Sequence, residues 1–127
     1  MRKCIFILLV ILAVSYRLEA KKQEVVMPSG KEIYIPKDLQ GMDLQNPDSK
    51  WSYHRMAYTD NFVIFWEKGF GNDLSNPPQL EGHNMKVDLL NLTEKLESFY
   101  HFFRDTLKFS KPGSKCDKYR MMVMLNY

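Results

Sequence analysis

Cysteine is scarce in this chain of 127 residues, which contains only two, Cys4 and Cys116. Cys4 lies in an N-terminal segment with the features of an export signal, so Cys116 is the only thiol expected in the processed protein. One thiol cannot form an internal disulfide. We therefore expect core packing to hold the exported domain together, which suits a bacterial envelope protein better than a small extracellular animal module.

Metal-binding and catalytic motifs are also lacking. The three histidines, His54, His83 and His101, do not have metal-ligand spacing, and the sequence contains neither HExxH nor CxxC. The Gly-Phe-Gly turn at 69–71 lacks the third glycine and the adjoining helix of a dinucleotide-binding fingerprint. Cys116 has no histidine partner fixed by the sequence, so an inert or metal-scavenging thiol is expected. We predict that this chain holds no cofactor and is not an enzyme by itself.

Charge of one sign is not in excess. The formal net charge is +3, but residues 1–20 hold three basic side chains and one acidic one. The rest of the chain therefore carries 15 basic and 14 acidic side chains. This balance gives no electrostatic reason to expect nucleic acid or an anionic membrane as a partner, because both require a clustered basic face.

The longest apolar run is too short to cross a membrane. It covers eleven residues, 4–14, follows Arg2 and Lys3, and precedes a polar segment ending at Ala20. This is the pattern of a secretory signal peptide over residues 1–20, whereas a membrane span needs about 20 apolar residues. We predict export to the medium, the periplasm or the cell envelope, with no stable membrane span after processing. A retained anchor is the alternative.

Two apolar segments enclose one strongly periodic segment. Residues 61–67, NFVIFWE, are almost continuously apolar and rich in β-branched and aromatic side chains, which indicates a strand buried on both faces. Residues 118–127 alternate but are largely apolar on both faces, which indicates a second inner strand. The helical pattern of residues 86–108 lies between them. This order predicts a βαβ unit, and therefore an α/β fold with a partial parallel sheet.

The expected helix has one apolar stripe, which should face the sheet. Charged residues, including Glu97 and Arg104, are expected on the opposite, solvent-facing side. The stripe consists of side chains three and four positions apart: Leu89, Leu92, Leu96, Phe99, Phe103 and Leu107.

One helix covers only one face of a sheet, so the second face needs another cover. Residues 21–50 are expected to form an extended lead-in with a short edge strand or an extended arm within 31–36, and residues 51–127 a partial α/β domain. The cover is therefore expected from outside this chain. A truncated chain is the preferred explanation, and an obligate partner is the alternative.

The loop after the first strand is the candidate ligand-binding region, since it spans about 18 residues and long loops are often functional. Glu67 and Asp73 lie on either side of its first turn and could act as acid and base if they converge on a pocket. Aromatic side chains placed in loops could form a platform for sugar rings, although aromatic residues more often belong to a core. The candidate ligand-binding residues are Trp51, Tyr53, Glu67, Phe70, Asp73 and His83.

Four phrases of the sequence carry a family resemblance over residues 51–127. They are WSYHRMAYTDNFVIFWE, GFGND, LLNLTEKLESFYHFFRDTLKF and DKYRMMVMLNY. Together they resemble a group of secreted, uncharacterised proteins of Bacteroidetes-type bacteria. Larger members look like zincin-type metallopeptidases, with an HExxH zinc helix downstream of these elements.

This resemblance implies that residues 51–127 are the N-terminal scaffold of a metallopeptidase-like protein and that this chain is inactive alone. It also implies that zinc would enter only through a downstream HExxH segment. The alternative function is a surface module that binds carbohydrate or protein through the loop at 68–85, with a glycan or a polypeptide as its ligand.

Overall fold

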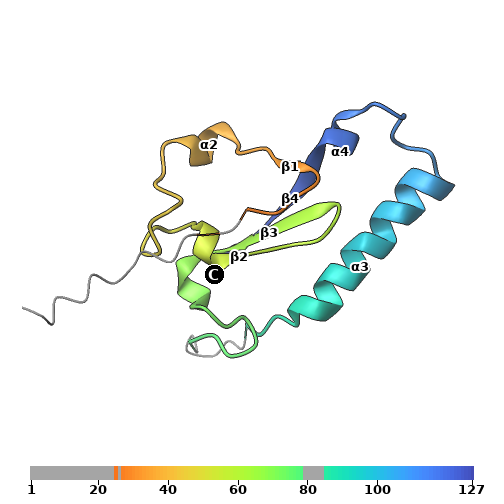
Figure 1. Ribbon diagram of the computed structural model, residues 1–127. Coiled ribbons are helices and arrows are strands. Elements are labelled where there is room, and N and C mark those ends of the chain that lie inside the picture. The colour runs from red at the N-terminus through yellow and green to blue at the C-terminus, as the bar shows by residue number, and fades with distance from the viewer. Residues whose placement is uncertain (1–24, 26, 79–84) are drawn as a thin grey trace, which may run out of the picture.

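The structure is a computed structural model that describes residue 25 and residues 27–78 and 85–127 (Figure 1). Its centre is a four-stranded sheet with the strand order β1-β4-β3-β2. β3 and β4 are parallel, β1 is parallel to β4, and β2 is antiparallel to β3. The strands are β1 Glu32–Ile33, β2 Met56–Tyr58, β3 Phe62–Trp66 and β4 Tyr119–Leu125.

One long helix and several short ones surround this sheet. The long helix is α3, Leu89–His101, which continues into a π-helical turn, η3, Phe102–Thr106. α3 begins at Leu89 because the Asp88 side chain caps its first turn, accepting the Asn91 N–H at 3.0 Å. The short helices are α2 Lys37–Gln40, α4 Lys115–Lys118 and the 3₁₀ turns η1 Tyr53–Arg55 and η2 Lys68–Phe70.

The predicted βαβ unit is confirmed. β3, α3 and β4 follow one another along the chain, and β3 pairs with β4 in parallel from Phe62 opposite Met121 to Trp66 opposite Leu125. The predicted strand bounds agree within two residues, but the helix begins three residues later than expected. The fold is therefore a mixed α/β fold with an open sheet (Figure 1).

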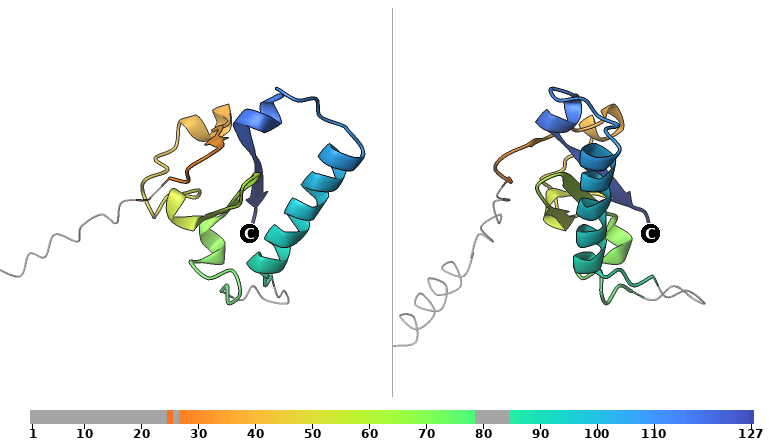
Figure 2. Two further views of the ribbon diagram at one scale, coloured as in Figure 1. Left: turned by 45° about the vertical axis from the view of Figure 1, so that its right-hand side comes forward. Right: turned by 90° about the vertical axis from the view of Figure 1, so that its right-hand side faces the viewer.

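The expectation that the second face of the sheet needs a cover from outside this chain is wrong for β3. Side chains of β3 alternate between the two faces, and all five are buried. Val63 and Phe65 pack against Leu39, Leu44 and Trp51, which come from the segment between β1 and β2. Figure 2 shows this segment and α3 on opposite sides of the sheet. The sequence did not reveal this cover because short helices and turns have no periodicity.

The other face of β3 packs against α3 and the loop that precedes it. Trp66 forms a cluster with Phe70 and Leu74, against which Leu89 of α3 and Leu125 of β4 pack. The Phe62 ring contacts the Tyr100 ring, edge to face, with centroids 6.1 Å apart.

The predicted apolar stripe of α3 is correct only in its first half. Leu89, Leu92 and Leu96 are partly buried, as expected, but Phe99, Phe103 and Leu107 are exposed. The stripe already departs from the sheet at Phe99, within α3, and the π-helical turn, in which Leu107 N–H bonds to Phe102 C=O five residues back, changes the facing of the later side chains further. Its wider turn rotates each successive side chain by less than an α-helix does. Phe103 and Leu107 are therefore carried away from the sheet.

Two charged residues predicted to face solvent lie on the sheet side of the helix instead. Glu97 and Arg104 are partly buried, and both form hydrogen bonds inward. The expectation that they lie on the solvent face is wrong, because the sheet-facing side of α3 near its C-terminal end meets polar loops.

Candidate functional site

The aromatic residues predicted to bind sugar do not share a surface. Trp51 and Phe70 are 4 % and 2 % exposed, and they belong to separate core clusters on opposite faces of the sheet. Tyr53 is partly buried against the Phe65 ring, with centroids 5.9 Å apart. These three side chains therefore contribute to the core and do not form a platform.

The two carboxylates predicted as acid and base make separate local contacts. Glu67 accepts a hydrogen bond from the Tyr127 N–H at 3.2 Å and lies 3.6 Å from Lys50 Nζ. Asp73 accepts from both the side chain and the N–H of Ser75, at 2.6 and 2.9 Å. These hydrogen bonds hold the pKa of Asp73 below its ordinary value. The sixth predicted residue, His83, lies outside the described residues.

Asp73 is the one predicted residue that lines the largest described cavity. This cavity, of about 500 Å³, lies beyond the carboxyl end of β3 and beside the start of α3. Trp66 and Leu89 provide apolar surface, and Asn72, Lys86 and Asp88 provide polar groups. Asp88 caps α3, so the N–H groups at this helix end already have an anionic partner.

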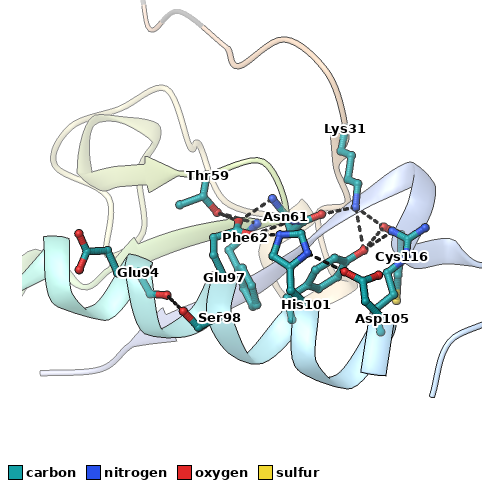
Figure 3. A network of polar contacts seen from close by, with 12 residues as sticks. Lys31, Thr59, Asn61, Phe62, Glu94, Glu97, Ser98, His101, Asp105 and Cys116 are labelled. Carbon is teal, nitrogen blue, oxygen red and sulfur yellow. Dashed lines mark hydrogen bonds and ion pairs between the residues drawn. The ribbon is translucent and has the colours of Figure 1, made fainter. Parts of the chain in front are cut away.

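A polar network joins the beginning of β3 to α3 (Figure 3). The Glu97 carboxylate accepts hydrogen bonds from the Asn61 N–H at 2.9 Å, from Asn61 Nδ2 at 2.7 Å and from the Thr59 hydroxyl. Burial raises the pKa of Glu97, but the hydrogen bonds from Asn61 and Thr59 outweigh it, so the pKa lies below its ordinary value. The carboxylate is thus held charged by donors from the β2–β3 turn.

Lys31 extends this network to the beginning of β4. Its ammonium group donates to Asn61 Oδ1, to the Tyr100 hydroxyl at 3.0 Å and to the Cys116 carbonyl at 2.6 Å (Figure 3). These partners come from the β2–β3 turn, α3 and α4. The network therefore fastens four parts of the chain at the amino ends of β3 and β4, and its groups satisfy one another, which indicates a structural role.

The outer edge of β4 is a different kind of feature, because most of it has no strand beside it. β3 pairs with β4 at five positions, whereas β1 pairs only with Tyr119 and Arg120. Met121 N–H bonds to Asn61 C=O at 2.8 Å, and Leu125 C=O accepts from Glu67 N–H at 3.0 Å, so odd-numbered residues face β3. The alternation of a strand then turns the N–H and C=O of Met122 and Met124 outward.

Side-chain exposure agrees with an open edge. Val63, Ile64 and Phe65 of β3 are completely buried, whereas their register partners on β4, residues 122–124, are only partly buried. Among the described residues, no strand lies beyond β4 after Ile33, the end of β1.

A cavity of about 390 Å³ lies where β1 leaves the edge of β4. Tyr34, 57 % exposed, stands at its rim and contacts the Tyr119 ring edge to face, with centroids 5.6 Å apart. The lining residues are Tyr34, Pro36, Lys115, Cys116, Tyr119, Arg120, Met121 and Met122. The site thus combines outward backbone groups with a hollow of mixed polarity.

Arg120 fixes the place where β1 begins its pairing with β4. It is a buried arginine whose guanidinium donates to the carbonyls of Thr59 at 2.6 Å, Ser29 at 2.8 Å and Lys31. These bonds hold β1 against the first two residues of β4 only. Sequence reasoning identified 118–127 as an inner strand, and β4 does lie between β1 and β3, but it did not show that β1 pairs with only two residues of β4. The signal was the brevity of the 31–36 segment, whose Pro36 cannot donate a ladder hydrogen bond.

The described residues contain no group of three or more histidine, cysteine, aspartate or glutamate side chains that could hold a metal ion. Within the same part of the chain, no helix has both the length and the apolar character needed to cross a membrane.

These features define a small mixed α/β domain in which, among the described residues, most of the outer edge of β4 has no strand beside it. The chain belongs to the family of unknown function DUF6055, whose model matches residues 25–127. No curated protein and no solved structure matches the chain.

Proposed function

We propose that this chain is a polypeptide-binding domain that takes up an extended segment of its ligand along the outer edge of β4. The observation that carries the proposal is the unequal pairing of β4, at five positions with β3 but at only two with β1. An open strand edge presents a row of backbone donors and acceptors, and an added strand pairs with them directly.

The sequence of β4 strengthens this interpretation. Proteins protect open edges with charges, prolines or bulges, yet residues 121–125 are Met, Met, Val, Met and Leu. An unprotected strand edge of this kind is expected to pair with an extended polypeptide. Methionine side chains adapt to differently shaped apolar partners, which suits a surface that binds more than one sequence.

A polypeptide ligand fits the site better than a glycan. Sugar rings are usually bound by exposed aromatic faces, but Trp51 and Phe70 lie in the core. By contrast, the cavity next to Tyr34 and Met122 could receive a side chain of an added strand. This cavity would provide sequence preference, while the backbone of β4 would provide affinity.

We also propose that the domain acts outside the cytoplasm. The supporting feature is the sequence pattern of residues 1–20, a basic start followed by a short apolar run and a small residue at Ala20. An exported binding domain would meet its polypeptide ligand in the periplasm, in the cell envelope or in the medium.

A second candidate function is the scaffold part of a zincin-like metallopeptidase. It rests on the resemblance of residues 51–127, and the open edge of β4 gives it one structural support, since a further strand of a larger protein could pair there. The expectation that the second face of the sheet needs a cover from a larger protein no longer supports this function, because α2 and η1 already cover the second face of β3. A genomic reading frame that continues past Tyr127 into an HExxH segment would support this function, and a stop codon would contradict it.

The peptide-binding proposal can be tested with random dodecapeptides displayed on phage and selected against the full chain. A selected peptide, once synthesised, should slow hydrogen exchange at the amides of Met122 and Met124. Met122→Pro removes an outward N–H and should weaken binding at least about tenfold, the equivalent of one lost hydrogen bond. The matched control, Met122→Leu, keeps the N–H and should bind like the wild type.

Two results would contradict the proposal. Peptides that bind without protecting these amides would place the binding site elsewhere on the chain. Equal binding by Met122→Pro and Met122→Leu, with unchanged circular dichroism, would show that the backbone edge is not used.

A further inference from the structure

Five large apolar side chains remain exposed at the C-terminal end of α3 and in the segment after it. We call Phe99, Phe102, Phe103, Leu107 and Phe109 the phenylalanine patch; its members are 44 to 75 % exposed, and Phe109 is the most exposed. The rings form a contiguous series, with centroids 5.8 Å apart for Phe102 and Phe103 and 5.7 Å apart for Phe103 and Phe109. Contiguous exposed apolar surface of this kind marks an interaction site.

The patch also contains a hollow that offers few polar groups. A cavity of about 270 Å³ opens between α3 and β4 and is lined mainly by apolar side chains, including Phe62, Phe99, Phe103, Phe109 and Met121. A ligand in this hollow would make many apolar contacts and few hydrogen bonds.

The charges around the patch are mainly positive. The segment from Phe99 to Lys118 contains five basic side chains and two acidic ones. Both acidic side chains are already engaged, Asp105 with His101 at 2.9 Å and Asp117 in an ion pair with Arg104. Exposed lysines precede and follow the outermost ring, at positions 108 and 111.

From this combination we infer that the phenylalanine patch binds the surface of an anionic lipid bilayer. The rings would lie at the boundary between headgroups and acyl chains, while Lys108 and Lys111 would meet anionic headgroups. The near-neutral charge of the chain beyond its leader argued against an anionic membrane. That net charge is an average over the chain, and lysines are locally in excess near the phenylalanine patch. The excess matters for membrane binding because it lies beside exposed apolar side chains.

A second copy of this chain is a poorer occupant of the patch. A symmetric dimer through this face would bring Lys108 and Lys111 of both copies into one interface, and an excess of like charge at an interface is costly. A protein partner usually adds about one hydrogen bond per 100–200 Å² of interface, for which the hollow has few groups. A bilayer needs no such directional partners.

This inference does not depend on the proposed peptide site. It rests on the exposed side of η3 and the segment after it, whereas the peptide site rests on the backbone edge of β4. Bilayer binding through the patch needs no membrane-spanning helix.

The test uses the full chain with tryptophan at the most exposed ring, Phe109→Trp, and vesicles of phosphatidylcholine with or without phosphatidylglycerol. Adding anionic vesicles should shift the emission of this tryptophan to the blue, and brominated lipids should quench it. The control is Leu90→Trp, at a 70 % exposed position in the first turn of α3, which should show neither effect. The native tryptophans, Trp51 and Trp66, are buried in both variants. The readout is local, so lipid binding by the apolar run at 4–14 does not produce it.

The role of charge is tested in the Phe109→Trp background. Reversing Lys108 and Lys111 to glutamate should raise the lipid concentration for half-maximal shift at least about tenfold, given roughly 1 kcal/mol per lysine near an anionic surface. Reversing the exposed Lys37 and Lys95 should have little effect. The inference fails if Phe109→Trp shows no shift, or if vesicles without phosphatidylglycerol give the same shift. It also fails if a shift occurs without lipid as protein concentration rises, because a second copy then covers the patch.

Discussion

At the scale of single residues, Glu97 shows that a helical pattern can predict the wrong solvent exposure for a charged side chain. Its charge predicts a place in solvent, yet it lies on the sheet side of α3 and accepts three hydrogen bonds from Thr59 and Asn61. A partly buried carboxylate is stable there because the donors replace the lost water. The β2–β3 turn that provides these donors is 36 residues away in sequence, so no local sequence pattern predicts the contact.

Replacing Glu97 by glutamine should lower the free energy of unfolding by about 1–3 kcal/mol at pH 7, because the amide NH₂ would face the donors of Asn61. Urea denaturation measures this difference. The control is Glu94→Gln, one turn earlier on the exposed side, which should change stability by less than about 0.5 kcal/mol.

The stabilisation by Glu97 should also depend on pH. The pKa of Glu97 is lower in the folded chain than its ordinary value of 4.5. The contribution of the ionised carboxylate to the free energy of unfolding is therefore complete above pH 4.5. It is lost as pH falls through the lower pKa of the folded state. The stability difference between wild type and Glu97→Gln should therefore shrink below about pH 4.5. A difference that stayed constant from pH 7 to pH 3 would contradict this role.

At the scale of elements, β4 is paired along one edge, whereas the other edge has no strand beside it after Arg120 in the described part of the chain, and the two edges can be distinguished by mutation. Odd-numbered residues bond to β3, so their N–H groups are needed for the sheet, whereas the N–H groups of Met122 and Met124 face outward. Proline is tolerated in a strand where its missing N–H would face solvent.

Val123→Pro should therefore unfold the chain or cost at least about 3 kcal/mol, whereas Met124→Pro should cost markedly less. Thermal unfolding followed by circular dichroism compares the two neighbouring variants directly. Similar losses in both would indicate that the outer edge of β4 is bonded to something after all, and would weaken the proposed peptide site.

At the scale of the whole molecule, the segment between β1 and β2 is part of the core. Leu39, Leu44 and Trp51 pack against Val63 and Phe65 and close the face opposite α3 (Figure 2). The chain is thus built in layers around β3, with α3 on one side and the short elements α2 and η1 on the other.

Leu39→Ala should lower the free energy of unfolding by about 2–4 kcal/mol, as expected for a leucine buried in a core. Leu90→Ala, at an exposed position of α3, is the matched control and should cost less than about 0.5 kcal/mol. Tryptophan fluorescence and far-ultraviolet circular dichroism should report one shared transition. A negligible effect of Leu39→Ala would show that the segment between β1 and β2 is only a lead-in.

Much of the fold could be predicted from the sequence, whereas little of the candidate site could. Apolar runs and helical periodicity are local signals, so β3, α3 and β4 were found with their parallel order. The candidate residues in the loop were chosen by type and position, and two of the aromatic ones, Trp51 and Phe70, are buried in the core. Residue type cannot distinguish an exposed aromatic ring from a buried one when the surrounding segment has no period.

The sequence by itself determined the βαβ unit, because burial on both faces requires continuous apolar runs and a covering helix requires a 3.6-residue period. Only the tertiary structure decided what covers the second face, which edge of β4 is open and which side of α3 carries exposed phenylalanines. Each of these depends on contacts between distant segments or on the π-helical turn at Phe102–Thr106, which no local pattern of side chains records.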